Sequence, residues 1–224
     1  MPRVSKAVAA AHHQAIEAAA SRLFRERGLR GVSVAEVMAD VGLTHGGFYL
    51  HYASKDALAA AACGHAFAQA HEKWQRRVAS ADSPAAAKRA IAESYLDTAY
   101  RDPAVAACPT ATLVTDVARE PATHPIHAAY LAGVTRQIDT LAALGASGDA
   151  APDRAAACVQ LATMMGALLL ARATRGHAVS DEILDAARAH LAAAAPDEPG
   201  AAHPVVPAAL RHKRRRGLPK EAQP

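Results

Sequence analysis

The sequence has few cysteines and few aromatic side chains. Its 224 residues include three Cys, and Phe, Trp and Tyr together make up 4% of them. An odd number of widely spaced cysteines argues against a disulfide framework and suits a reducing compartment, so we expect a cytoplasmic protein. The sparse aromatic residues Trp74, Tyr95, Tyr100 and Tyr130 either line a ligand cavity or pack in a helical core.

Long apolar segments are also missing. The apolar stretch near the N-terminus, residues 8–11, is too short for the core of a signal peptide. The longest apolar run, residues 155–171, is interrupted by Gln160, Thr163 and Gly166 and falls short of the roughly 18 to 20 residues that a bilayer requires. We therefore expect no membrane segment, and we interpret this run as a buried interface helix.

Motifs of the common enzyme classes are absent too. The chain has no Ser-His-Asp spacing, nucleophile elbow, glycine-rich phosphate loop or paired carboxylates, so we expect neither enzymatic activity nor a cofactor.

Among its 12 histidines, His124 and His127 are three residues apart and can share one helix face. They either form part of a metal site or are solvated or pocket-lining. Because no acidic or thiol partner lies at a supporting spacing, we expect no metal.

The hydropathy pattern is helical nearly everywhere, with no alternating strand signal and no internal repeat, so we predict an all-α fold. Capping residues, glycines and prolines indicate where the helices begin and end. We expect helices over residues 5–27, 33–41, 44–51, 54–79 and 83–101, three more starting at Pro109, Pro125 and Pro152, and a last one capped by Ser180-Asp181-Glu182 and ending near Ala195. Cys63 and Cys158 lie inside helices and are interpreted as packing residues.

The positive charge is unevenly distributed. The whole chain carries +4, yet residues 211–224 hold six Lys or Arg against one Glu, a local +5, which leaves −1 for the rest. Residues 1–55 hold seven Lys or Arg against four acids, a modest +3. The basic run 211–216 is either an extra nonspecific contact to nucleic acid or a solvated run. Binding by the N-terminal part therefore depends on where its side chains are placed.

Residues 33–58 are the most informative stretch. Ser33 with Glu36 three residues later forms the sequence pattern of a capping box, which starts a helix. Gly42 supplies the left-handed residue that ends this helix, and Thr44 is a favourable cap for the next one. Only Gly42 and Leu43 separate the two helices, and so short a connection forces them to cross steeply. It predicts a helix-turn-helix, whose second helix enters a DNA groove.

The second of these helices, residues 44–51, contains Gly46 and Gly47, each costing roughly 1 kcal/mol relative to Ala. A helix surface without Cβ atoms lets the backbone approach phosphates and base edges closely. The alternative is a loose helical turn without a function. Phe48 and Tyr52 are four residues apart and share the buried side, which leaves Tyr49 and His51 facing outward. Lys55 follows the cap residue Ser54, so its ammonium group and the N–H groups of the third helix can hold one phosphate together.

The run from Gly42 to Leu58, with its Tyr-x-His-aromatic-x-x-Lys-x-x-Leu spacing, resembles the DNA-binding signature of TetR-type transcriptional regulators. The resemblance extends back into the first helix, where a pair of alanines is followed by the pattern Leu-Phe-x-x-x-Gly. The matching residues there are Ala18, Ala19, Leu23, Phe24, Arg27 and Gly28. It covers residues 12–62 closely, and the remainder only by helical layout and length.

Carried over position by position, the resemblance assigns a role to each matching residue. It implies that Thr44, Tyr49, His51 and Lys55 hold the phosphate backbone of a double-stranded DNA operator. His45, Gly46 and Gly47 would then lie against base edges, and Ser33 would cap its helix and touch a phosphate. One histidine and two glycines offer few groups for bidentate base reading, so specificity rests partly on DNA shape and flanking residues.

The rest of the chain is expected to dimerise and to sense an effector. The two apolar helices over 153–175 and 180–195 are candidates for a homodimer interface, as the resemblance also implies. A dimer presents two recognition helices about 34 to 36 Å apart, so the operator should be a near-palindrome. Cys108 precedes Pro109 at the start of a predicted helix, where N–H groups stabilise a thiolate; it is either a sensor of oxidants or electrophiles or an inert packing residue.

We therefore predict three segments. Residues 5–53 form a helix-turn-helix DNA-binding domain, residues 54–195 form a helical domain for effector binding and dimerisation, and residues 196–224 form a disordered basic tail. The predicted function is a dimeric repressor released from DNA by a small-molecule or oxidant effector. The alternative is a helical small-molecule carrier or enzyme whose N-terminal part is only structural.

Overall fold

The computed structural model describes residues 6–102, 108–145 and 152–193, and these residues are helical with no strand among them. The first part holds α1 (Lys6–Arg27), α2 (Val34–Asp40), the 3-10 helix η1 (His45–Leu50), α3 (Lys55–Ala79), α4 (Pro84–Tyr95) and α5 (Thr98–Arg101). The second part holds α6 (Pro109–Arg119), α7 (Ile126–Gly145), α8 (Arg154–Ala173) and α9 (Ala178–Ala193). The predicted all-α fold is confirmed. The predicted tail, 196–224, lies outside the described residues.

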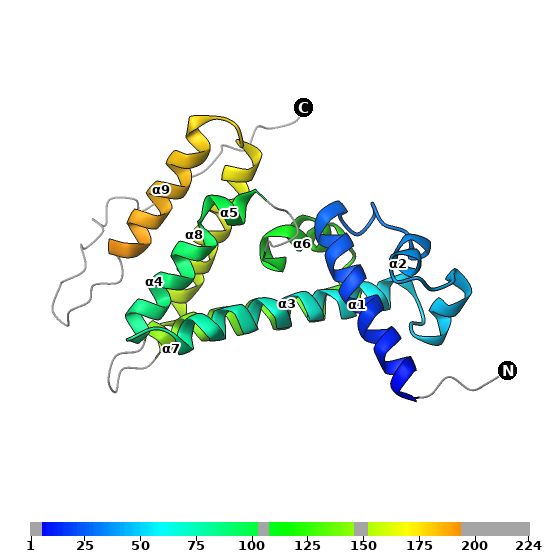
Figure 1. Ribbon diagram of the computed structural model, residues 1–224. Coiled ribbons are helices and arrows are strands. Elements are labelled where there is room, and N and C mark those ends of the chain that lie inside the picture. The colour runs from blue at the N-terminus through cyan, green and yellow to red at the C-terminus, as the bar shows by residue number, and fades with distance from the viewer. Residues whose placement is uncertain (1–5, 103–107, 146–151, 194–224) are drawn as a thin grey trace, which may run out of the picture.

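The long helix α3 joins the two ends of the molecule. At its N-terminal end α1, α2 and η1 form a head, and at its C-terminal end α4, α8 and α9 form a body (Figure 1). α7 runs along α3, and α8 and α9 pack against each other as a hairpin. α6 lies between head and body and contacts α1, α3, α7 and α8.

Two apolar cores follow this arrangement. The head core holds the apolar face of α1, all of it buried: Ile16, Ala19, Ala20, Leu23 and Phe24. Leu58 and Phe67 of α3 and Leu113 of α6 belong to the same core, so α3 and α6 pack against the head. The body core gathers residues of α3, α4, α6, α7, α8 and α9. The proposed boundary at residues 53 and 54 stays a prediction, and α3 contributes side chains to both cores.

The aromatic residues serve mainly as packing. Trp74 and Tyr95 are buried in the body core, and Tyr100 packs against it. Tyr130 packs on the head core, with its ring centroid 5.5 Å from that of Phe67. Cys63 is buried as predicted, but Cys158 is exposed on α8, so its interpretation as a packing residue within the subunit was wrong.

Two predicted helix boundaries were wrong. The helix expected over 83–101 stops at Tyr95, and α5 begins after Asp97, whose side chain accepts a hydrogen bond from the N–H of Ala99 at 2.7 Å. The last helix begins at Ala178, so Ser180 lies inside it and does not cap it. Its buried hydroxyl donates instead to the carbonyl oxygen of Ala171 at 2.7 Å. A serine satisfies a backbone group wherever tertiary packing brings one close, and sequence spacing does not reveal this.

Candidate DNA-binding interface

The capping box predicted at the start of α2 is present. The N–H of Ser33 donates to Glu36 Oε2 at 2.7 Å, its hydroxyl donates to the same oxygen at 2.8 Å, and Ser33 Oγ accepts from the N–H of Glu36 at 3.2 Å. The Ser33 backbone, its hydroxyl and then Arg27 lower the pKa of Glu36 to about 2. Both donors of Ser33 are therefore engaged by Glu36, and its contact with a DNA phosphate stays a prediction.

The turn after α2 is as tight as the sequence indicated. Gly42 has φ of +70°, the left-handed conformation that glycine adopts without a steric penalty. The N–H of Gly42 donates to Ala39 O at 3.1 Å, and the N–H of Leu43 donates to Met38 O at 2.9 Å. These bonds satisfy the last carbonyls of α2, so the chain leaves that helix sharply and starts the next one after two more residues.

The second helix of the motif is a short 3-10 helix, η1, and not an α-helix. Its hydrogen bonds join Gly47 N to Thr44 O at 3.0 Å and His51 N to Phe48 O at 2.8 Å. Gly46 and Gly47 weaken an α-helix here, and the tighter winding suits a segment of six residues. Thr44 stands at the cap position, but its side chain makes no cap hydrogen bond, so the capping role predicted for it was wrong.

One side of η1 anchors it to the head. Phe48 is 1% exposed, and its ring stacks on that of Tyr52 with centroids 5.9 Å apart, as the four-residue spacing predicted. Tyr52 in turn stacks on His13 of α1 at 4.7 Å, and its hydroxyl lies 3.2 Å from His13 Nε2. These contacts hold the backbone of η1 against α1 and α2, which fixes the direction of its opposite side.

The opposite side of η1 is open to solvent. Thr44, His45 and Gly46 are exposed, Gly47 is half-buried, and Tyr49 is 67% exposed. A Cβ atom added at Gly46 would meet nothing within 4 Å, so the backbone there is bare. The structure thus brings the predicted base-edge residues together on one accessible surface beside Tyr49.

Leu50 was missed by the sequence reasoning. It is the most exposed large apolar residue described, at 86%, and it sits beside Tyr49 at the end of η1. An exposed leucine on a surface shaped to meet DNA can pack against a thymine methyl group or a sugar ring. The signal in the sequence was its position between the buried Phe48 and Tyr52, on the side of η1 that faces away from the core.

His51 is less accessible than predicted. Its side chain is half-buried, with its ring centroid 6.2 Å from that of His12 and 6.2 Å from that of His13. Burial, followed by the charges of His13 and His12, lowers the pKa of His51. The neutral ring is therefore favoured in the free protein, and a phosphate beside it would favour the protonated ring.

Lys55 begins α3, directly after the cap. Ser54 Oγ accepts a hydrogen bond from the N–H of Ala57 at 3.1 Å, as predicted for a cap residue. The next residue, Asp56, lies 3.4 Å from Nε2 of His124 in the segment before α7. The start of α3, where a phosphate is expected, is thus tied directly to the second half of the chain.

The two histidines considered for a metal site are engaged otherwise. The ring of His124 accepts a hydrogen bond from the N–H of Ile126 at 3.2 Å and faces Asp56, while His127 Nε2 lies 3.1 Å from the carbonyl oxygen of Glu120. The residues that the structure describes contain no group of three or more His, Cys, Asp or Glu side chains placed to hold a metal ion.

A helix-turn-helix with an exposed second helix, attached to an all-α body, is an arrangement typical of DNA-binding regulators. Residues 16–62 match the family model of bacterial regulatory proteins of the tetR family. No curated protein matches the chain. Residues 16–62 therefore resemble the DNA-binding part of the TetR family of transcriptional regulators.

Several solved structures share the fold of this chain. The reduced form of E. coli NemR aligns with a TM-score of 0.70 and 22% identity, over 83% of this chain and 98% of that one. A TetR regulator of Chloroflexus aurantiacus aligns with a TM-score of 0.67 and 26% identity, over 82% and 93% of the two chains. The TetR-family regulator SCO4454 of Streptomyces coelicolor aligns with a TM-score of 0.67 and 24% identity, over 83% of this chain and 96% of that one.

Proposed function

We propose that this regulator is a cytoplasmic repressor that binds a near-palindromic operator as a homodimer and leaves it when an effector binds. The observation that carries the proposal is the bare, outward surface of η1, held rigidly by the stacked rings of Phe48 and Tyr52. On this surface we assign base-edge contacts to His45, Gly46 and Gly47. We assign phosphate contacts to the flanking residues, namely Ser33, Thr44, Tyr49, His51 and Lys55.

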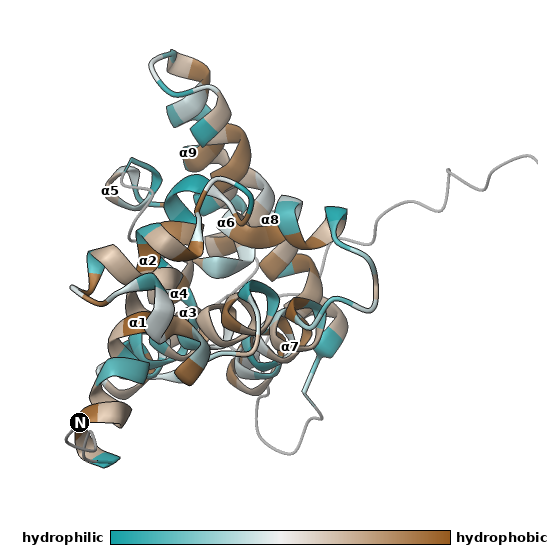
Figure 2. Cartoon of the chain, turned by 90° about the vertical axis from the view of Figure 1, so that its right-hand side faces the viewer, coloured by the Kyte–Doolittle hydropathy of each residue, from teal (hydrophilic) through white to brown (hydrophobic). Residues whose placement is uncertain are grey.

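The dimer part of the proposal is supported by α8. This helix is long and apolar enough by composition to cross a membrane, and only 39% of the apolar window is buried within the subunit. Its exposed residues include Val159 and Leu170, 61% and 57% exposed and 11 positions apart, which places them on one face of the helix. A second subunit packing on this face would cover it. Figure 2 shows the apolar stretches of α8 and α9 in brown.

The effector part is supported by contacts between α6 and the head. The N–H of Leu29, in the loop between α1 and α2, donates to Asp116 Oδ2 at 3.3 Å. Arg30 of the same loop lies 3.4 Å from Glu120 Oε1 at the end of α6. With the pair of His124 and Asp56, three contacts tie the region of α6 to the head. A displacement of α6 would therefore move the head, and a ligand that prefers the displaced state would shift the population away from DNA.

Two substitutions on the DNA-binding surface separate its roles. Lys55→Ala should weaken binding to all DNA sequences alike and lower the slope of log K against log salt by about 1, because one phosphate contact is lost. His45→Ala should cost about 1 to 3 kcal/mol mainly on the preferred operator, because it touches bases. Fluorescence anisotropy with the operator and with random duplex, across a salt series, measures both. An equal loss on both duplexes for His45→Ala would contradict its role.

The same titration decides between this proposal and the alternative of a carrier or enzyme. A protein that neutralises phosphates shows a steep salt dependence of DNA affinity, whereas a carrier whose head is only structural shows no DNA binding at low salt. The operator used in the titration is obtained by selecting bound fragments from random DNA.

Cys108 is the residue through which an oxidant or electrophile would act. It stands at the cap position of α6 as predicted, but it is 1% exposed. Its thiol donates to Thr110 Oγ1 at 3.3 Å, and the side-chain N–H of Gln137 donates to its sulfur at 3.2 Å. Burial protects the sulfur, so reagents reach it only when the region opens.

Cys108→Ser should abolish release from DNA by N-ethylmaleimide, which adds its alkene carbon to the thiolate sulfur while the thiol proton ends on the neighbouring carbon. The exposed Cys158 is the matched control, and Cys158→Ser should leave the response intact. Anisotropy of labelled operator before and after treatment gives the readout. If Cys108→Ser still releases DNA to the same extent, the sensing role is wrong and Cys108 is a packing residue.

A further inference from the structure

A small cavity lies where the head meets the body. It is lined by Arg25 of α1, Gln69 and Lys73 of α3, Tyr100 of α5 and Pro109 at the first turn of α6, with Ala66 and Ala70 of α3. Two cationic side chains from different helices thus face one small space. The space is about 10 Å³, room for roughly one water-sized group.

The charges around this cavity are mostly of one sign. Burial lowers the pKa of Lys73, and the charges of Arg25, Arg77 and Arg76 lower it further. Arg77 is held nearby, because its Nη1 donates to the carbonyl oxygen of Lys73 at 3.1 Å. Like charges gathered in a partly desolvated place cost free energy, and a negative ligand would remove this cost.

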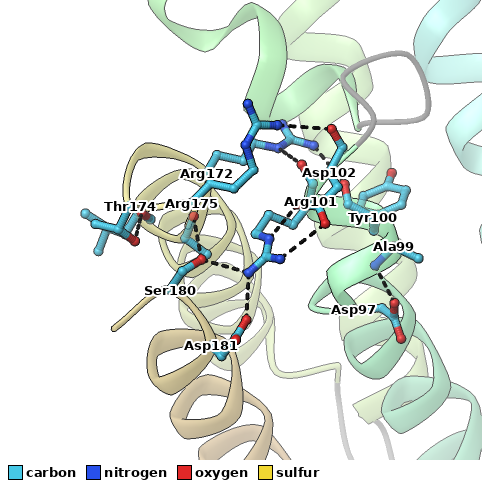
Figure 3. Close-up of polar contacts among 12 residues, drawn as sticks. Asp97, Ala99, Tyr100, Arg101, Asp102, Arg172, Thr174, Arg175, Ser180 and Asp181 are labelled. Carbon is cyan, nitrogen blue, oxygen red and sulfur yellow. Dashed lines mark hydrogen bonds and ion pairs between the residues drawn. The ribbon is translucent and has the colours of Figure 1, made fainter. Parts of the chain in front are cut away.

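A further cation is fixed at the backbone of Tyr100. The guanidinium group of Arg172 on α8 donates to the carbonyl oxygens of Tyr100 at 3.0 Å and of Arg101 at 3.2 Å (Figure 3). Burial raises the pKa of the Tyr100 hydroxyl, and the charges of Arg172 and Arg25 act in the opposite direction. Tyr100 is therefore influenced by cations that come from α1 and from α8.

A buried hydroxyl without a partner lies next to this group. Tyr95 is 2% exposed, its ring centroid is 5.5 Å from that of Tyr100, and its hydroxyl has no hydrogen-bond partner among the described residues. A buried hydroxyl normally has a partner, and leaving one unpaired costs roughly 1 to 3 kcal/mol. Tyr95 does not line the cavity, and it is the neighbouring cations that favour an acceptor carrying negative charge.

We infer that the effector carries a carboxylate or phosphate group, which binds among Arg25, Lys73 and Tyr100 at the start of α6. This inference rests on the proposed function and names the chemistry of its effector. The positive end of the α6 dipole adds to the attraction, because the N-terminus of a helix favours an anion. An oxyanion is larger than the present space. It enters only if α1 and α6 move apart, and this movement would turn the head.

The test measures the thermal unfolding of the full chain with inorganic phosphate, with sodium benzoate and with neutral benzamide, against sodium chloride at matched ionic strength. Phosphate or benzoate should raise Tm beyond chloride, and benzamide should not. Lys73→Met keeps the aliphatic stem and should weaken the effect about tenfold or more, as expected for losing a charged partner. Lys88→Met is the matched control, a half-buried lysine on α4 that does not line the cavity.

Release of labelled operator by the same anions is measured in parallel. Anion-specific stabilisation with release, both lost in Lys73→Met, supports the inference, and the responding anion tells a carboxylate from a phosphate. If DNA binding is intact, any of three results overturns the inference. Neither anion raises Tm more than chloride does, or the anion stabilises Lys73→Met as much as the wild type, or it raises Tm without releasing the operator. Anion-specific stabilisation in a chain that binds no DNA would instead overturn the proposed function and leave the anion site in place.

Discussion

Gly133→Ala is expected to lower the free energy of unfolding by about 3 kcal/mol. Gly133 is buried on α7, where the helix crosses α3. A Cβ atom at this position would lie 2.1 Å from Cγ of Phe67 and 2.3 and 2.4 Å from its two Cδ atoms. No rotation of a terminal group relieves this overlap, because Phe67 is itself 6% exposed and packed against Tyr130. Urea unfolding followed by circular dichroism gives the measurement.

Gly64→Ala is the matched control for this substitution. Gly64 is on α3, in the middle of a helix, and a Cβ atom there would meet nothing within 4 Å. The change should raise stability by up to about 1 kcal/mol, because alanine is the better helix former. Phe67→Leu combined with Gly133→Ala should recover part of the loss. If Gly133→Ala proves as stable as Gly64→Ala, the close packing of α3 on α7 is wrong.

Leu170→Glu is expected to convert the proposed dimer into monomers and to lower operator affinity by about a hundredfold or more, because two half-sites are then no longer held by one molecule. Leu170 lies on the exposed apolar face of α8, where a carboxylate would be buried without a partner if a second subunit covers it. Val159→Glu, three helical turns away on the same face, should act alike. Light scattering measures the mass, and anisotropy measures the affinity.

Leu131→Glu controls for adding a charge to an exposed leucine. Leu131 is 67% exposed on α7, outside the α8 and α9 hairpin, so the change should leave the mass and the affinity unchanged. Retention of a dimer by both Leu170→Glu and Val159→Glu would show that this face is not the subunit interface. A wild-type chain that is monomeric while binding its operator tightly would remove the reason for a palindromic site.

Short-range patterns in the sequence predicted the local structure well. The capping box of Ser33 and Glu36, the left-handed Gly42, the cap at Ser54 and the helix starting at Pro109 are all present. Each of these depends on hydrogen bonds or dihedral angles within a few residues, so neighbouring residues are enough to specify it. At the two wrong boundaries, groups distant in the sequence meet: the carbonyl oxygen of Leu96 accepts from Arg188, and the hydroxyl of Ser180 accepts from Arg101.

The candidate site was only partly predictable, because some of its side chains are placed by residues distant in the sequence. The outward positions of His45 and Tyr49 followed from which neighbours are apolar, since Phe48 and Tyr52 must be buried. The half-burial of His51 did not follow, because it depends on His12 and His13 of α1, some 40 residues earlier. Leu50 was overlooked since an exposed leucine is unremarkable in a sequence until its surface is known.

The amino-acid sequence by itself determined that this protein is all-α, where most of its helices begin, and that a short glycine-containing segment follows a tight turn. These properties come from periodicity, caps and dihedral preferences, which act over a few residues. Only the tertiary structure decided that Gly133 must accept the ring of Phe67, that Asp116 and Glu120 of α6 hold the head, and that Arg25 and Lys73 share one cavity. Such contacts join residues 40 or more positions apart, and they exist only once the helices pack.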